Sequence, residues 1–194
     1  SPSFHPGRDQ INLVYIGRCS DLFSESLRFL LSILQTWKVE KREGISCYFI
    51  GTSYYGEESY TSALARDYKV SDIVQESCQR IPFHESVQLM RDGDITLILG
   101  TKDRAYLPSK LYNCIAASNK VLVICHSKSE LARVCKNLNL SSVLYYDKNT
   151  VQQACEALAD LLKQSRNAAR DEKLLRKIST ENMTRKLCRF FDRV

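Results

Sequence analysis

The residues best suited to hold an anionic ligand follow the first apolar run of the sequence. Gly17 and Arg18 come directly after the run 11–16. A glycine lets the backbone approach a ligand closely, and an arginine pairs well with a phosphate through parallel hydrogen bonds. These two residues are therefore candidate phosphate ligands. A turn glycine with no ligand is the alternative interpretation.

A second polar group lies at a predicted helix start, in the segment 106–113. Pro108 ends any earlier helix, Ser109 is a favourable N-cap, and Leu111 opens an apolar face. The free N–H groups and positive dipole end of such a helix attract phosphate. The positive charge of Lys110 in the first turn is unfavourable beside that dipole, and a bound diphosphate would remove this cost. A lysine whose ammonium group reaches solvent is the alternative.

Other reactive residue types are poorly placed for chemistry. His84 stands beside Glu85 after a proline, which is more typical of a helix start than of a catalytic pair. The eight cysteines are scattered without C-x-x-C spacing, and no histidine lies close to a cysteine pair. We therefore expect buried, reduced cysteines, no metal and no assignable catalytic residue.

Six short runs are rich in β-branched and aromatic residues. Their apolar residues stand at consecutive positions, which is typical of parallel strands buried on both faces. Helical spacing recurs between them, for instance in Phe23, Leu27, Leu30, Leu31 and Leu34. The predicted strands are 11–16, 46–50, 72–75, 95–99, 121–125 and 143–146.

Alternating strands and helices predict an α/β fold. We expect a doubly wound, mostly parallel six-stranded Rossmann-like sheet over residues 11–165, with helices on both faces. Ligands bind such sheets beyond the carboxyl ends of the strands. The residues that follow the strands are therefore the candidate site.

The two ends of the chain differ from this central part. Residues 1–10 form a polar lead-in, interpreted as a linker remnant rather than a signal peptide. The net charge of the 194 residues is +6, and residues 163–194 hold ten lysines and arginines against four acids. The basic segment 166–194 is expected to be helical.

Two partners suit the basic segment 166–194. We favour packing of its apolar side on the domain or on an absent N-terminal half, and the alternative is an anionic membrane surface. No apolar run is long enough to span a bilayer. Residues 1–162 are neutral overall, so no nucleic-acid partner is predicted. The expected location is the cytoplasm, with membrane association at its face as the second hypothesis.

Three segments resemble one enzyme family in the right order and spacing. Ile81–Gly100, Leu107–Ala117 and Ser129–Ala132 are similar to stretches of the family-four (group 1) retaining glycosyltransferases. That family has the GT-B fold, in which two Rossmann-like halves face across a cleft. The likeness covers only the C-terminal half, which binds the nucleotide-sugar donor and needs no metal here. The resemblance thus implies a glycosyltransferase whose acceptor-binding N-terminal half is absent, and a fragment that is inactive alone.

The resemblance also implies roles for individual residues. It places Gly17 and Arg18 near the diphosphate, and Asn113 at the ribose hydroxyl groups. The base would be flanked by the backbone of Arg80, Ile81 and Pro82. The phosphate would bind at the helix N-terminus formed by Ser109, Lys110 and Leu111.

The sequence departs from the family where two glutamates usually stand eight positions apart. Ala105 and Asn113 occupy these positions here. Asparagine keeps only one acceptor oxygen and carries no charge, so weaker ribose binding is expected. The alternative function is therefore a degenerate, non-catalytic GT-B domain used for scaffolding or interaction. A phospho-receiver domain is disfavoured, because only Asp21 represents the acid cluster that its Mg²⁺ requires.

Overall fold

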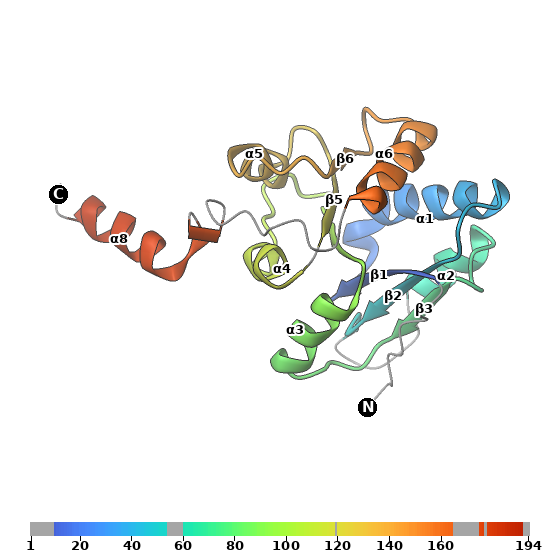
Figure 1. Ribbon diagram of the computed structural model, residues 1–194, viewed down its shortest axis with the longest axis horizontal. Helices are drawn as coiled ribbons and strands as arrows, with labels where there is room; N and C mark the ends of the chain where they lie inside the picture. The colour runs from blue at the N-terminus through green and yellow to red at the C-terminus, as the bar shows by residue number, and fades with distance from the viewer. Residues whose placement is uncertain (1–9, 54–59, 119, 165–174, 177, 192–194) are drawn as a thin grey trace.

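The computed structural model describes residues 10–53, 60–118, 120–164, 175–176 and 178–191. Within them, six strands form one parallel sheet in the order β3-β2-β1-β4-β5-β6 (Figure 1). The expected doubly wound α/β sheet is confirmed. The strands are β1 (Ile11–Ile16), β2 (Ile45–Ile50), β3 (Val74–Ser77), β4 (Ile95–Leu99), β5 (Val121–Cys125) and β6 (Val143–Tyr145).

Helices cover both faces of this sheet. One face packs against α1, α2 and α6, and the other packs against α3, α4 and α5 (Figure 1). The helices are α1 (Ser24–Val39), α2 (Tyr60–Asp67), α3 (Phe83–Asp92), α4 (Leu111–Ala117), α5 (Glu130–Asn137) and α6 (Val151–Lys163). A short 3-10 helix, η1 (Asp21–Phe23), precedes α1.

Consecutive apolar residues of a strand serve opposite faces. Leu97 and Leu99 pack into the core beside α1, whereas Ile98 packs into the core beside α4. Successive side chains of a strand point to opposite sides, so a strand covered on both faces needs apolar residues at most positions. This is why β5 is an uninterrupted apolar run, and why β4 is apolar except for Thr96, whose hydroxyl accepts from that of Ser118 at 2.6 Å.

The third predicted strand, 72–75, is displaced from the observed β3 by two residues. Residues 71–73 instead form the turn after α2, in which the N–H of Val74 donates to the carbonyl of Val70 at 3.0 Å. β3 itself is an edge strand with the polar sequence Val-Gln-Glu-Ser. Its polarity hid it from a criterion based on apolar runs.

The C-terminal helix α8 (Thr180–Phe191) extends away from the sheet and its covering helices (Figure 1). Helix is observed in the described part of the basic segment, whereas residues 165–174 lie outside the described part, as do residues 1–9 of the predicted lead-in. Among the described residues, no helix is long and apolar enough to cross a membrane. The packing and membrane hypotheses for 166–194 remain predictions.

The contact between Gly93 and Val14 yields a stability prediction. A Cβ at Gly93 would lie 2.7 Å from Cγ2 of Val14, so Gly93→Ala should lower the free energy of unfolding by about 1–3 kcal/mol. In a Val14→Ala background the added methyl group should instead be neutral or stabilising. The φ of Gly93 is −68°, which alanine adopts freely while losing less chain entropy.

Urea denaturation of the parent, both single variants and the double variant measures this coupling. We expect a favourable coupling energy of about 1 kcal/mol or more. Strictly additive effects would mean that the Val14 side chain does not limit the space at Gly93.

Candidate functional site

The order of the strands places a crevice between β1 and β4. The chain leaves β1 toward α1 on one face of the sheet and leaves β4 toward α4 on the other. Such a reversal separates the two loops at the carboxyl edge, which is where open α/β sheets bind their ligands. The candidate site is therefore built from the loops that follow these two central strands.

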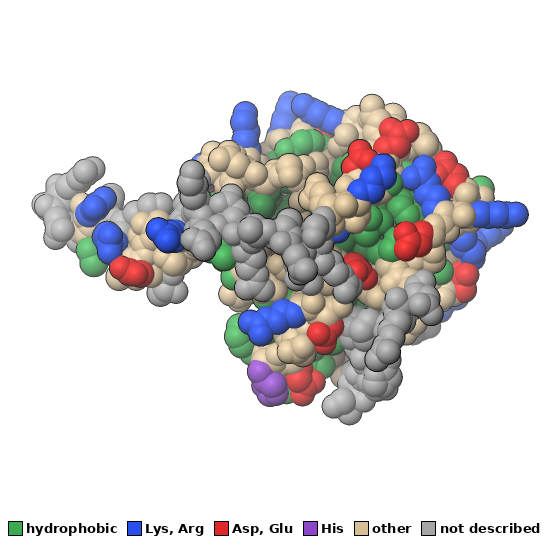
Figure 2. All heavy atoms as spheres, in the orientation of Figure 1, with side chains coloured by type: hydrophobic (Ala, Val, Ile, Leu, Met, Phe, Trp, Pro, Cys, Tyr) green, Lys and Arg blue, Asp and Glu red, His purple; other side chains and the backbone are tan. Residues whose placement is uncertain are grey.

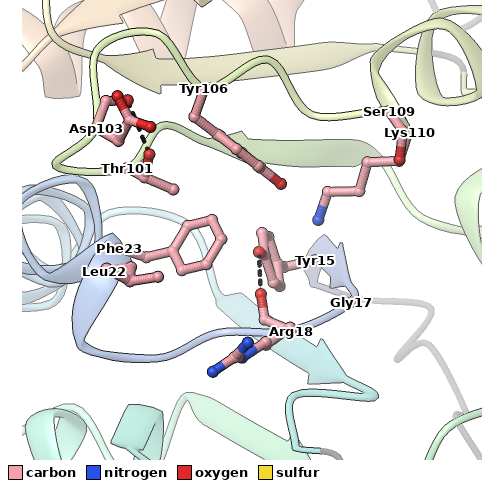
Figure 3. Close-up of a pocket in the computed structure, with 10 residues that line it drawn as sticks. All are labelled: Tyr15, Gly17, Arg18, Leu22, Phe23, Thr101, Asp103, Tyr106, Ser109 and Lys110. Carbon is pink, nitrogen blue, oxygen red and sulfur yellow. Dashed lines mark hydrogen bonds between the residues drawn. The ribbon is translucent and has the colours of Figure 1, made fainter.

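A pocket of about 400 Å³ occupies this crevice (Figure 3). Its lining comes from β1 and the loop after it, from η1, and from the segment between β4 and α4. Basic, acidic and aromatic side chains all contribute. The lining residues are Tyr15, Gly17, Arg18, Leu22, Phe23, Thr101, Asp103, Tyr106, Ser109 and Lys110.

The ammonium group of Lys110 lies at the end of β1. Its Nζ donates to the backbone carbonyl of Ile16 at 2.6 Å and lies 3.6 Å from the ring centroid of Tyr15. Burial removes water from the ammonium and lowers the pKa of Lys110 to about 8. The carbonyl oxygen and the face of the aromatic ring are partial negative charges that favour the protonated form. A phosphate in the pocket would favour it further.

Gly17 is required by the backbone at this position. Its φ is +119°, a conformation that residues with a Cβ rarely adopt, and its N–H donates to the carbonyl of Ile50 at 2.8 Å. A Cβ there would also lie 3.4 Å from the Nζ of Lys110. The turn function of Gly17 and its place beside the cation are thus compatible.

Three aromatic rings line one wall of the pocket. Phe23 meets Tyr15 edge to face, with ring centroids 6.4 Å apart, and meets Tyr106 in the same way at 6.2 Å (Figure 3). The hydroxyl of Tyr15 donates to the carbonyl of Arg18 at 2.7 Å and so holds the loop after β1. Burial raises the pKa of Tyr15 well above its usual value, so it remains a neutral donor.

A compact turn carries the residues that follow β4. The Thr101 hydroxyl donates to the Asp103 carbonyl at 3.0 Å, and the Ala105 N–H donates to Oδ1 of Asp103 at 2.9 Å. The N–H of Tyr106 donates to the same carbonyl at 3.2 Å. These bonds fix Asp103 and aim the following residues across the crevice.

Four of the predicted site residues line the pocket: Gly17, Arg18, Ser109 and Lys110. In Figure 3 the side chain of Lys110 points toward Tyr15 and Gly17, whereas that of Arg18 extends away from Lys110. Predicting Ser109 as the N-cap was wrong. Lys110 occupies that position, because its carbonyl accepts the first helical bond from the N–H of Cys114 at 2.9 Å.

The other predicted residues lie outside the lining. The segment Arg80–Pro82 follows β3. It lies beside the end of β2, since the Cα of Arg80 would be 3.7 Å from a Cβ placed on Gly51. Leu111 is fully buried, and its N–H donates to the carbonyl of Pro108 at 3.1 Å. Asn113 is exposed on α4. Helix α4 has only seven residues. The main positive charge at this place is therefore the ammonium of Lys110, and the helix dipole contributes less.

The three aromatic residues, Thr101 and Asp103 were not among the site residues predicted from the sequence. Their positions just after β1 and β4 were the available signal, because side chains after the central strands meet at one edge. The strand order decides which of these side chains face each other, and this order was not predicted from the sequence.

Elsewhere at this sheet edge, Ser127 and Asp147 connect the ends of β5 and β6. The Ser127 N–H donates to Oδ1 of Asp147 at 2.7 Å and its hydroxyl donates to Oδ2 at 2.6 Å. His126 Nε2 lies 3.7 Å from Asp147 Oδ2, while Nδ1 accepts from the N–H of Lys128 at 3.0 Å. Since the serine is bonded to the aspartate and not to the histidine, this is no nucleophilic triad. Within the described residues, no cluster of three potential ligands could hold a metal ion.

Solved glycosyltransferase structures share this fold. They include a trehalose-phosphate synthase (UDP-forming) from Burkholderia vietnamiensis (12% identity, TM-score 0.66, covering 96% of this chain and 46% of that one). The N-terminal domain of trehalose-6-phosphate phosphatase from Candida albicans is similar as well (14%, 0.65, 95% and 43%). So is a trehalose-6-phosphate structure from E. coli bound with UDP-2-fluoro glucose (15%, 0.64, 95% and 44%).

These likenesses identify the class of fold. The six-stranded parallel sheet and its helices form a Rossmann-like α/β fold that matches GT-B proteins. This chain spans less than half the length of each of the three. No protein-family model and no curated protein matches the sequence.

The lowered pKa of Lys110 predicts a pH-dependent stability. The folded chain loses this proton near pH 8, whereas an unfolded lysine keeps it to above pH 10. The unfolded state therefore binds more protons above pH 8, and the free energy of unfolding rises with pH there. Between pH 7 and pH 9 the parent should gain about 1 kcal/mol relative to Lys110→Met.

Urea denaturation at both pH values measures this difference. Lys102→Met, which changes an exposed lysine in the same loop, should keep the pH dependence of the parent. An unchanged profile in Lys110→Met would show that the ammonium is well hydrated.

Proposed function

We propose that this chain is the nucleotide-sugar-binding domain of a glycosyltransferase. The observation that carries the proposal is the Lys110 ammonium beside Gly17, in a pocket between the loops that follow β1 and β4. This is where Rossmann-like sheets bind nucleotides. The fold of the E. coli protein bound with UDP-2-fluoro glucose, and of the UDP-forming Burkholderia enzyme, supports the same assignment.

The geometry suits a diphosphate at the β1 end of the pocket. Lys110 has three N–H donors, and the carbonyl of Ile16 takes one of them. A diphosphate beside Gly17 could accept from the others while the glycine lets its oxygens approach the backbone. When the bond from sugar to diphosphate breaks, negative charge grows on the departing phosphate, and a fixed cation stabilises that charge.

Transfer to an acceptor requires groups beyond this pocket. The sequence resemblance to family-four enzymes supports a retaining reaction and an acceptor-binding partner domain, both of which are proposals here. Arg80–Pro82 remain candidates for flanking the base, since their segment lies at the same sheet edge. We assign no catalytic residue and no metal.

The proposed function predicts that the isolated chain binds a nucleotide. Thermal-shift measurements with UDP, GDP, ADP, CMP and their sugar conjugates should reveal stabilisation by at least one nucleoside diphosphate. A ligand at 100 times its dissociation constant contributes about 2.7 kcal/mol. With the best of these ligands, Lys110→Ala should weaken binding by roughly 1–2 kcal/mol, the usual range for a hydrogen bond to a charged group.

Two variants serve as controls in this titration. Lys102→Ala removes an exposed lysine outside the lining and should bind like the parent. Asn113→Ala should cost less than Lys110→Ala, because Asn113 also lies outside the lining. Equal affinity of Lys110→Ala and the parent would refute the phosphate assignment. If none of the ligands binds, the scaffolding alternative replaces the proposed function.

The pKa of Lys110 also predicts that diphosphate binding takes up protons. At pH 8 about half of the free chains carry the neutral amine, and a bound diphosphate favours the ammonium. Binding at pH 8 should therefore take up about half a proton, and affinity should fall as the pH rises above 8. Calorimetric titrations in two buffers of different ionisation enthalpy measure this uptake. Uptake that persists in Lys110→Ala would assign the proton to another group.

A further inference from the structure

The pocket carries opposite charges in two different loops. The Lys110 ammonium lies at the end of β1, whereas Asp103 stands in the loop that follows β4 (Figure 3). Of the ten residues that line the pocket, Asp103 is the only acid. A ligand that fills the pocket therefore lies between one loop with a cation and another with an acid.

The carboxylate of Asp103 is held in place with acceptor capacity to spare. Its Oδ1 accepts from the N–H of Ala105 at 2.9 Å, and its backbone carbonyl accepts from Thr101 and Tyr106. No hydrogen bond to Oδ2 comes from any residue that the structure describes. An ionised carboxylate offers about four acceptor sites and no donor. Asp103 therefore suits hydroxyl groups and repels anions.

The aromatic wall suits the same kind of group. Phe23 and Tyr106 are in edge-to-face contact at 6.2 Å, and Tyr106 keeps 39% of its surface exposed. Aromatic rings offer apolar area, and tyrosine adds a polar hydroxyl. The C–H face of a sugar ring could cover such rings while its hydroxyl groups reach a nearby carboxylate.

We propose that Asp103 determines which sugar the site accepts. This inference rests on the proposed function. Asp103 accepts hydrogen bonds from an uncharged glycosyl group, such as a hexose, and disfavours sugars that carry a carboxylate, such as a uronic acid. The role proposed for Asp103 is specificity, separate from the breaking of the bond from sugar to diphosphate.

The expected discrimination follows from electrostatics at a partly solvated site. Two unit negative charges about 4 Å apart near a protein surface repel enough to lower affinity by roughly tenfold or more. A hydroxyl group at the same place gains a charge-assisted hydrogen bond instead. The two effects act in the same direction.

Calorimetric titration with UDP, UDP-glucose and UDP-glucuronate tests the inference. The parent should bind UDP-glucose roughly tenfold more tightly than UDP-glucuronate. Asp103→Asn keeps the oxygen that accepts from Ala105 but removes the charge, so this ratio should fall to about twofold or less. UDP carries no sugar near Asp103, so its affinity should change less on Asp103→Asn than that of UDP-glucuronate.

Control and reversal variants sharpen the result. Asp67→Asn changes an exposed acid on α2 outside the lining and should keep the ratio of the parent. Asp103→Lys should reverse the preference in favour of UDP-glucuronate. Should Asp103→Asn disturb the loop, Asp103→Ser also offers an oxygen to the Ala105 N–H and should lose the discrimination in the same way.

The failures of the two proposals are distinguishable. If UDP and UDP-glucose bind but the glucose-to-glucuronate ratio is the same in the parent and Asp103→Asn, the specificity role is wrong and the nucleotide site stands. If the parent binds none of the three uridine ligands, this inference is overturned. The comparison with GDP, ADP and CMP then shows whether the proposed function is overturned with it.

Discussion

The candidate site depends on the hydrogen bond from the Lys110 ammonium to the carbonyl of Ile16, 2.6 Å long and spanning 94 residues of sequence. It connects the end of β1 to the start of α4, across the crevice where a ligand would lie. Burying an ammonium is costly unless its donors are satisfied, and the folded chain supplies one carbonyl and the face of the Tyr15 ring. Burial still lowers the pKa of Lys110 to about 8, because the ammonium has lost water. An anion in the pocket would favour the charged form.

The sheet topology explains why the crevice lies at this place. β1 and β4 are neighbours in the centre of the sheet, and the chain leaves them toward opposite faces. Their loops therefore separate at the carboxyl edge, and the pocket fills the space between them. The positive φ of Gly17 turns the chain sharply after β1, and the bond from the Tyr15 hydroxyl to Arg18 holds the residues that follow. A stable core thus positions a polar site at its rim.

Much of the fold could be predicted because strands buried on both faces are apolar at most positions. β4 and β5 lie where the runs predicted them, whereas the polar edge strand β3 does not. The candidate site was harder to predict from the sequence. Gly17 and Lys110 stood out by type and position, but the partner of Lys110 is a distant backbone carbonyl, which no pattern of side chains reveals. Asp103 and Phe23 became candidates only when the strand order brought their loops together.

The central claim is that a diphosphate binds against Lys110 at the end of β1. A crystal structure of the chain with the nucleoside diphosphate that stabilises it most tests this directly. The account predicts diphosphate oxygens within hydrogen-bonding distance of the Lys110 Nζ and beside Gly17, in the pocket between the loops after β1 and β4. A nucleotide bound elsewhere on the protein, or one whose phosphates point away from Lys110, would contradict it.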